Sequence, residues 1–169
     1  MAKTLEKVKK HLNYLFLNTT PGAMAGSETW ARVGKSTEWT DTMNAKSTTY
    51  DYIEDSSPTD VVESYQPSTN IPLTAYIGDP VYEYIFNIAS KQITDAATDV
   101  LRVFQNKAIG GTGNIAQKTK CSITIDSNNI GTGVITFNIK QAGTPTLGTA
   151  TVSTATDGTP TPQFTPDAA

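Results

Sequence analysis

The chain contains one cysteine and one histidine, which limits the chemistry that its side chains can perform. Cys121 cannot form an intrachain disulfide, so a reducing compartment or a fold without cross-links is favoured. A structural zinc site needs several Cys and His ligands, and a Cys–His nucleophile needs both residues together. Because His11 lies among lysines and Cys121 alternates with isoleucines, we expect a solvated histidine, a buried thiol, and neither a metal nor a cofactor.

Charge and long hydrophobic runs are also scarce. Only 17% of the 169 residues are charged, and the net charge is −3. Tight binding to nucleic acid is not expected, because affinity for phosphate scales with clustered Lys and Arg. No run approaches the roughly 20 apolar residues of a membrane span. The apolar run from Leu12 to Leu17 is interrupted by Asn13 and is too short for a secretory signal. The length predicts one domain, residues 1–169.

Sequence patterns that resemble catalytic or nucleotide-binding motifs lack the right neighbours. Gly34-Lys35-Ser36 resembles the end of a phosphate loop, but Thr29 stands where the first glycine belongs. Gly111-x-Gly113 precedes a predicted strand, so a bound pyrophosphate would meet no helix N-terminus. Paired carboxylates do occur, but in the least core-like part of the chain, where a rigid catalytic cleft is not expected. We therefore expect no enzyme, and a small β-rich enzyme is the weakest alternative.

Strict alternation of apolar and polar residues predicts a mainly β fold. In the segments 121–126 and 135–140, one set of side chains is apolar and the other is Ser, Thr, Asn, Asp or Lys. Such strands place one face on a core and the other in water. Further strands are predicted near residues 14–18, 28–34, 71–77, 100–105 and 147–152. Together these elements predict an antiparallel β-sandwich or half-barrel.

One α-helix is predicted from about Pro80 to Gln92. Asp79 is a suitable N-cap, and proline is favoured at the first helical position. A wide apolar stripe along this helix should pack on the sheet. The segment 1–18 is ambiguous, because its apolar residues recur at helical spacing and also alternate as in a strand. We expect an N-terminal arm that leads into a first strand.

The segment from Asp41 to Ser68 is polar, acidic and too long for a simple connection. Its three tyrosines argue against plain disorder. We interpret it as a projecting loop or hairpin that contacts another subunit. Residues 142–169, rich in Gly, Thr and Pro, are expected to form an edge strand and an extended arm. The residues predicted to make the contact are Tyr50, Asp51, Tyr52, Glu54, Asp55, Asp60 and Glu63.

Charge is unevenly distributed along the chain. From residue 41 to residue 66, six acids face one base, which gives −5. From residue 102 to residue 120 there are four bases and no acid, which gives +4. Opposite patches on one subunit favour head-to-tail assembly. The predicted complementary bases are Arg102, Lys107, Lys118 and Lys120.

The order of these elements resembles the major tail tube proteins of long-tailed, non-contractile bacteriophages. The resemblance rests on the strand Trp30-Ala31-Arg32-Val33-Gly34, the acidic segment, the Asp79-Pro80 helix and the ending Leu147-Gly148-Thr149-Ala150-Thr151-Val152. It covers nearly the whole chain, through element order and size and not through a diagnostic motif.

The resemblance implies a structural protein of the virion tail that is assembled in the host cytoplasm. Six copies would form a ring, and stacked rings would form a tube around a tape-measure protein. Tail terminator and baseplate or distal tail proteins would be further partners. Double-stranded DNA would pass through the lumen without sequence-specific binding, and residues 41–68 and 142–169 would bridge rings.

A polar face with few charges would suit such a lumen, because it wets a channel without gripping phosphate. The predicted lumen face consists of Ser122, Thr124, Asp126, Thr136 and Asn138, with Lys140 at its margin. The main alternative function is a secreted or surface β-sandwich that serves as a binding or adhesion module.

Overall fold

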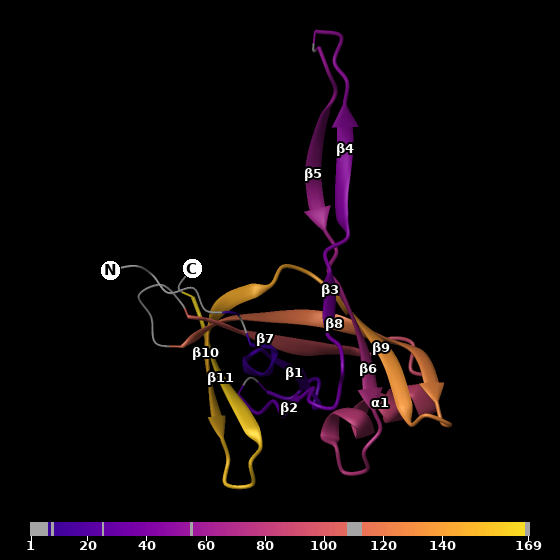
Figure 1. Ribbon diagram of the computed structural model, residues 1–169, viewed down its shortest axis with the longest axis vertical. Coiled ribbons are helices and arrows are strands. Elements are labelled where there is room, and N and C mark those ends of the chain that lie inside the picture. Colours follow the sequence, from indigo (N-terminus) through magenta and orange to yellow (C-terminus); the bar gives the residue numbers. More distant parts are fainter. Residues whose placement is uncertain (1–6, 8, 25, 55, 108–112, 168–169) are drawn as a thin grey trace.

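The computed structural model describes residues 7, 9–24, 26–54, 56–107 and 113–167, with the backbone alone for residues 105–107 (Figure 1). Within these residues the chain is almost entirely antiparallel β-structure, with a short 3-10 turn at Lys10–Leu12 and one α-helix, α1 (Pro80–Lys91). The strands are β1 (Tyr14–Asn18), β2 (Trp30–Arg32), β3 (Thr40–Thr42), β4 (Ala45–Tyr50), β5 (Thr59–Tyr65), β6 (Ser68–Thr74), β7 (Ala97–Lys107), β8 (Asn114–Asn129), β9 (Val134–Gln141), β10 (Thr146–Thr154) and β11 (Pro160–Pro166).

The main sheet runs in the order β2-β1-β7-β8-β9-β6-β3. Strand β8, 16 residues long, is its central member. One edge of β8 pairs with β7, while the other edge pairs first with β10 and then with β9. Within the described residues this path is open, since each end strand has one partner. The predicted mainly β fold with one flanking helix is confirmed.

Two hydrophobic clusters lie on opposite sides of the main sheet. The larger cluster joins α1 to the inward faces of β1, β6, β7, β8 and β9, with Phe137 and Leu73 fully buried. The smaller one contains Phe16, Leu101 and Val103, and β10 and β11 cover it. Strand β1 lies between the clusters and is therefore buried on both faces, which explains why Leu15, Phe16 and Leu17 are apolar in succession. By contrast, β9 alternates as its sequence predicts.

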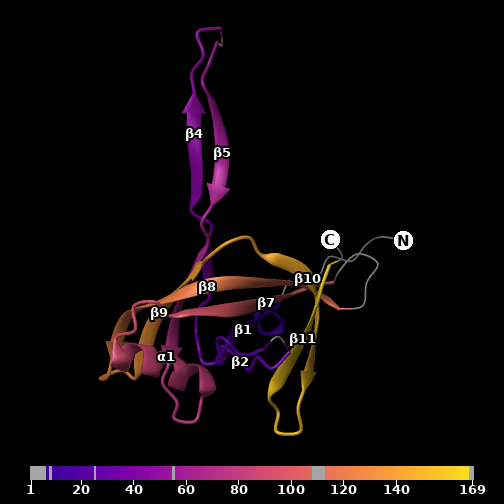
Figure 2. The same cartoon turned by 180° about the vertical axis from the view of Figure 1, so that it is seen from behind.

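Helix α1 begins and ends as predicted. The Asp79 carboxylate accepts a hydrogen bond from the Val81 N–H at 2.9 Å, and Pro80 occupies the first position. Gln92 adopts the left-handed conformation of a C-cap. Val81, Ile85 and Ile88 form the buried stripe, and the helix lies across one end of the sheet (Figure 2).

The sequence left the segment 1–18 open between helix and strand, and the structure shows a strand at Tyr14–Asn18. Strand β1 matches the predicted 14–18, and it follows the 3-10 turn at Lys10–Leu12. Residues 1–6 and 8, which were part of the predicted arm, lie outside the described residues. Two other predicted strands have different bounds in the structure. The strand predicted at 28–34 is shorter and corresponds to β2. The strand predicted at 71–77 corresponds to β6, which ends earlier because a turn begins at Tyr76.

The chain end forms a β-hairpin. The predicted strand 147–152 lies within β10, and the tail predicted as an arm turns back as β11. Three residues of β11 are prolines, at positions 160, 162 and 166, and their backbone nitrogens point away from β10. The N–H groups that point toward β10 belong to the alternate residues between them and to Asp167. Proline is tolerated at such an edge because no ladder bond is lost. Gly148 is required here, because a Cβ would lie 2.2 Å from the Thr165 carbonyl oxygen.

Truncation of Phe137 to alanine should lower the free energy of unfolding by about 3–5 kcal/mol, because it leaves a cavity in the larger cluster. Guanidinium titration followed by circular dichroism measures the change. The matched control is Ile130→Ala, an exposed residue in the β8–β9 turn, which should shift stability by less than about 0.5 kcal/mol. Equal effects for the two variants would contradict the assigned core.

Candidate functional site: the projecting hairpin and its foot

Strands β4 and β5 pair only with each other and form a hairpin that stands out from the body (Figures 1 and 2). Thr and Tyr occur in both strands, and β5 adds Val61 and Val62, residue types that favour extended structure. At its foot, residues 41–44 and 66–68, the Asn44 side-chain amide donates to the Gln66 carbonyl oxygen at 2.9 Å and to Ser68 Oγ at 3.0 Å. The predicted projecting segment is therefore a hairpin fixed at its base.

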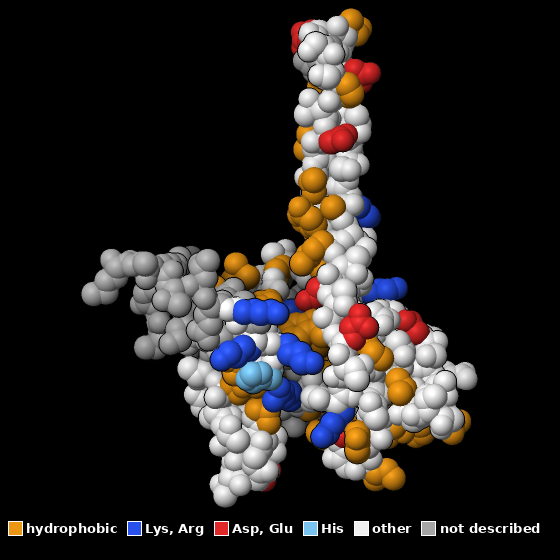
Figure 3. Space-filling model, viewed as in Figure 1, with side chains coloured by type: hydrophobic (Ala, Val, Ile, Leu, Met, Phe, Trp, Pro, Cys, Tyr) orange, Lys and Arg blue, Asp and Glu red, His pale blue; other side chains and the backbone are white. Residues whose placement is uncertain are grey.

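The hairpin exposes large apolar side chains on both of its faces. Paired residues share a face, so Val61 lies beside Thr48 on one side, and Val62 lies beside Ser47 on the other. Tyr50, Val61, Val62 and Tyr65 are all exposed, and Figure 3 shows hydrophobic side chains along the length of the hairpin. An isolated two-stranded hairpin is marginally stable in water. This surface has the character of one that a partner covers.

The tip, residues 51–54, combines acidic and apolar groups. The Tyr50 and Tyr52 rings stack with centroids 5.9 Å apart, and Ile53 is fully exposed. Asp51 and Glu54 are exposed and pair with no cation among the described residues.

The other predicted contact residues are also acidic. Asp60 and Glu63 are exposed on β5, and Asp60 accepts a hydrogen bond from Thr49 Oγ1 at 2.5 Å. Asp55 lies outside the described residues. The predicted contact residues that the structure describes therefore all lie on the hairpin.

Arg102 does not lie on a basic surface patch. Its side chain is only 4% exposed, because β7 directs it under the foot of the hairpin. There Arg102 Nη2 donates to Thr69 Oγ1 at 2.9 Å and lies 3.5 Å from Asp41 Oδ1, which also accepts a hydrogen bond from Thr69. The prediction of an exposed Arg102 was wrong, because its charge is used to anchor β3 and β6 to β7.

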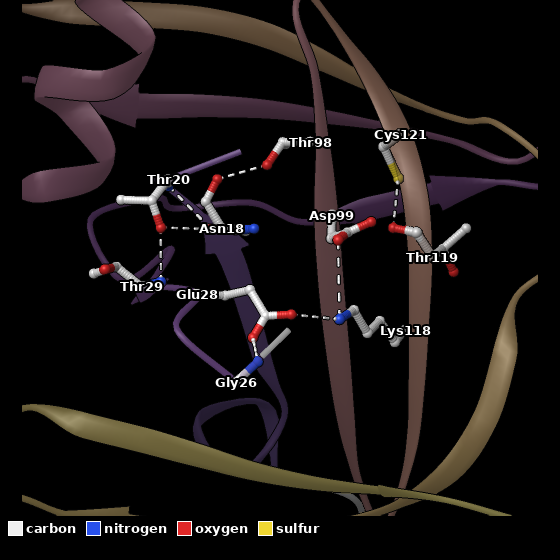
Figure 4. A network of polar contacts seen from close by, with 10 residues as sticks. All are labelled: Asn18, Thr20, Gly26, Glu28, Thr29, Thr98, Asp99, Lys118, Thr119 and Cys121. Carbon is white, nitrogen blue, oxygen red and sulfur yellow. Dashed lines mark hydrogen bonds and ion pairs between the residues drawn. The ribbon is translucent and has the colours of Figure 1, made fainter. Parts of the chain in front are cut away.

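Lys118 is also paired within the chain. Its Nζ lies 3.1 Å from Glu28 Oε1 and 3.9 Å from Asp99 Oδ2 (Figure 4). The same nitrogen lies 5.3 Å from the centre of the Trp30 ring. The hydrogen bond from Lys118 holds the pKa of Glu28 below its usual value. Figure 4 also shows a separate group of contacts at the β1–β2 connection, where Thr98 donates to the Asn18 carbonyl oxygen at 2.6 Å.

Of the four predicted bases, only Lys120 is exposed in the described part of the chain. The Lys107 side chain lies outside the described residues. The summed charge of the segment 102–120 therefore overstates its surface charge, because the fold neutralises Arg102 and Lys118 locally.

Two hollows lie at the foot of the hairpin and share Asp41 and Phe104 in their walls. The larger, which we call the foot hollow, has a volume of about 760 Å³; Lys10, His11, Arg32, Trp39, Leu15 and Ile71 are among its lining residues. On this side Figure 3 shows Lys and Arg side chains gathered around the histidine. Sequence reasoning missed the hollow, because its walls come from segments far apart in the chain.

The second hollow, of about 640 Å³, is lined by Met43, Tyr65 and three glutamines, with Arg102 at its wall. Arg102 Nε and Nη1 are buried and have no hydrogen-bond partner among the described residues. Both hollows thus lie at the foot of the hairpin. Lys10 and Arg32 border the foot hollow, and glutamine amides border the second one.

The predicted lumen residues share one polar face of β8 and β9, and none of them is buried. Asn138 Nδ2 donates to Asp126 Oδ2 at 2.5 Å, and Asn70 Nδ2 donates to the same carboxylate at 3.2 Å. Asn70, on the neighbouring strand β6, was not predicted. The alternation in β6, where Thr69, Ile71 and Leu73 are buried and Asn70 is exposed, could have identified it.

Potential reactive groups have few neighbours that would activate them. Cys121 is buried, and burial raises the pKa of its thiol to about 11. Among the residues that the structure describes, no group of three or more His, Cys, Asp or Glu could hold a metal ion. In that same part of the chain, no helix has the length and hydrophobicity to cross a membrane.

No protein-family model matches the chain, and no curated protein matches its sequence. Among solved structures, the chain is similar to one in the six-fold symmetrised cryo-EM structure of the anti-feeding prophage baseplate. The likeness covers 87% of this chain and 97% of that chain, with 8% identity and a TM-score of 0.44. At that level we base no functional conclusion on it.

The Asp41→Ala substitution should destabilise the fold by about 1–3 kcal/mol, because it leaves the buried Arg102 guanidinium with one acceptor fewer. Guanidinium titration measures the loss. The double variant Asp41→Ala with Arg102→Met should lose less than the sum of the two single losses, since the cation is then removed together with its acceptor. Strict additivity would contradict an interaction between the two side chains.

Proposed function

We propose that this chain is a structural subunit of a phage-tail-type tube, in which copies stack head to tail through the projecting hairpin. The observation that carries the proposal is the hairpin itself. It exposes apolar side chains on both faces and unpaired acids at its tip, and the described body covers neither face. An element that cannot bury its apolar surface within its own chain is stabilised when a neighbour buries it.

The asymmetry of the subunit favours an open, repeating assembly. The hairpin projects on one side, and in this proposal it contacts a different surface of the next copy. Such heterologous contacts generate rings if the rotation closes, and filaments if it does not. A ring that also contacts the ring above through its hairpins extends into a tube.

The resemblance to tail tube proteins supplies the finer expectations. The rings would contain six copies, and a tape-measure protein would occupy the lumen during assembly. Tail terminator and baseplate or distal tail proteins would close the two ends, and genome DNA would later pass through. The polar face of β8, β9 and β6 would line that channel, since its one described acid, Asp126, is held by the amides of Asn70 and Asn138.

Replacement of residues 46–64 by Asn-Gly should abolish polymerisation and leave the body folded. Asn-Gly forms a two-residue turn that suits the pair Ala45 and Tyr65, which face each other at the base. Negative-stain microscopy and sedimentation velocity of concentrated protein measure assembly, and thermal unfolding reports the fold. The wild-type chain should form tubes or rings. Tubes from the shortened chain, or a wild-type chain that stays monomeric at every concentration, would overturn the proposal.

Labelling of a Thr124→Cys variant tests the lumen assignment. In the monomer, a small maleimide and a maleimide carried on a bulky polymer should both label this exposed position. In tubes, only the small reagent should react, because the bulky one cannot enter the channel. Cys121 is buried and should contribute little labelling. If the bulky reagent labels the tubes as fast as it labels the monomer, the polar face does not line the lumen.

A further inference from the structure

We propose that the foot hollow is the receptor for the hairpin tip of a second copy, so that residues 51–54 of one subunit insert beside the foot of the hairpin in the next. This inference rests on the proposed function and specifies the surface that receives the hairpin. It replaces the acceptor surface that was predicted from the sequence, the bases Arg102, Lys107, Lys118 and Lys120.

The hairpin can reach a neighbouring copy, because it projects from the body along the long axis of the molecule (Figure 1). In a head-to-tail stack along that axis, its tip is directed toward the next copy. The foot hollow lies beside the start of the hairpin, because Asp41 forms part of its wall.

The charges of the two surfaces are complementary. Lys10 and Arg32 border the hollow, and neither pairs with an acidic side chain among the described residues. Arg32 Nη2 donates to the His11 carbonyl oxygen at 3.4 Å, and the guanidinium lies 4.5 Å from the centre of the Tyr14 ring. Asp51 and Glu54 supply two unpaired negative charges at the tip. Opposite charges at complementary positions steer association and fix the register.

The hollow keeps an excess of positive charge over its acids. Asp41 is engaged by Arg102 and Thr69, so its charge is compensated within the chain. Glu38 Oε1 accepts a hydrogen bond from the neutral Thr40 Oγ1 at 3.0 Å and keeps its negative charge. Lys10 and Arg32 together therefore exceed the one uncompensated acid of the lining by one charge.

The apolar residues of the tip and of the foot hollow are also complementary. Leu15 and Ile71 are buried and contribute to the lining, together with the partly buried Trp39 and Phe104. The indole N–H of Trp39 is buried and has no acceptor among the described residues. An inserted tip would place Tyr52 and Ile53 against this apolar surface, and its carbonyl and carboxylate oxygens could accept from the indole. An aromatic and aliphatic anchor in a pocket with a charged rim is typical of strong protein–protein contacts.

Charge reversal tests the pairing directly. A tip variant, Asp51→Lys with Glu54→Lys, and a hollow variant, Lys10→Glu with Arg32→Glu, should each raise the critical concentration for assembly by about tenfold or more, because attraction becomes repulsion. An equimolar mixture of the two variants should assemble again, since every tip then meets a hollow of opposite charge. The matched control, Lys91→Glu with Lys120→Glu, reverses two exposed bases outside the hollow and should leave assembly unchanged.

Cross-linking supplies a readout that does not depend on the reversed charges. Ile53→Cys protein, mixed with Thr37→Cys protein, should form a heterodimer with a short bis-maleimide, because Thr37 is exposed in the lining of the hollow. The control partner is Asp157→Cys, an exposed site on the β10–β11 turn, which should give at least about tenfold less product.

The outcomes separate this inference from the proposed function. If the wild-type chain forms tubes that need the hairpin, while neither the mixture nor the Thr37 cross-link behaves as expected, the foot hollow is not the receptor and the proposed function stands. If the Lys91 and Lys120 control blocks assembly and the hollow variant does not, the acceptor lies on the exposed surface around Lys120. If the hairpin is dispensable for assembly, both proposals fail.

Discussion

Strand β8 is the element on which the rest of the body depends, because its two edges hold most of the sheet together. It pairs with β7 on one edge, and its other edge is shared by β10 and β9 in turn. Since β10 and β9 pair with successive parts of one strand, the hairpin β10–β11 can cover the smaller cluster while β9 and β6 curve over the larger one. A single long strand thus serves both cores, and neither core could form without it.

That arrangement leaves β4 and β5 unpaired with any other strand of the described chain. Their residues are typical of β-strands, and the foot is fixed by Asn44 and by the buried cluster of Asp41, Thr69 and Arg102. The hairpin is therefore held rigidly at one end and exposed along its length. Its stability away from the foot would come from contact with a neighbour, which links the folding of this element to assembly.

The candidate site shows how the fold redistributes charge. Arg102 and Lys118 belong to the most basic stretch of the sequence, yet each is used to fasten one strand to another. The bases at the border of the foot hollow, Lys10 and Arg32, form no ion pair with an acid among the described residues, and Lys10 comes from the lysine-rich start of the chain. The charge that a surface presents therefore depends on which charged groups the fold pairs, as well as on their density along the sequence.

By itself, the sequence determined the local structure. Alternation fixed the exposed and buried faces of β8 and β9, Asp79 and Pro80 fixed the start of α1, and the acidic stretch with its tyrosines indicated the projecting hairpin. These features depend on neighbours within a few residues, so they can be read from periodicity and capping. Only the tertiary structure decided that β1 is buried on both faces, that β11 completes a hairpin, that Arg102 is an internal anchor, and that Lys10, Arg32 and Trp39 border one hollow. Each of these depends on strand pairings between residues far apart in the chain, and local pattern carries no information about which distant segments will meet.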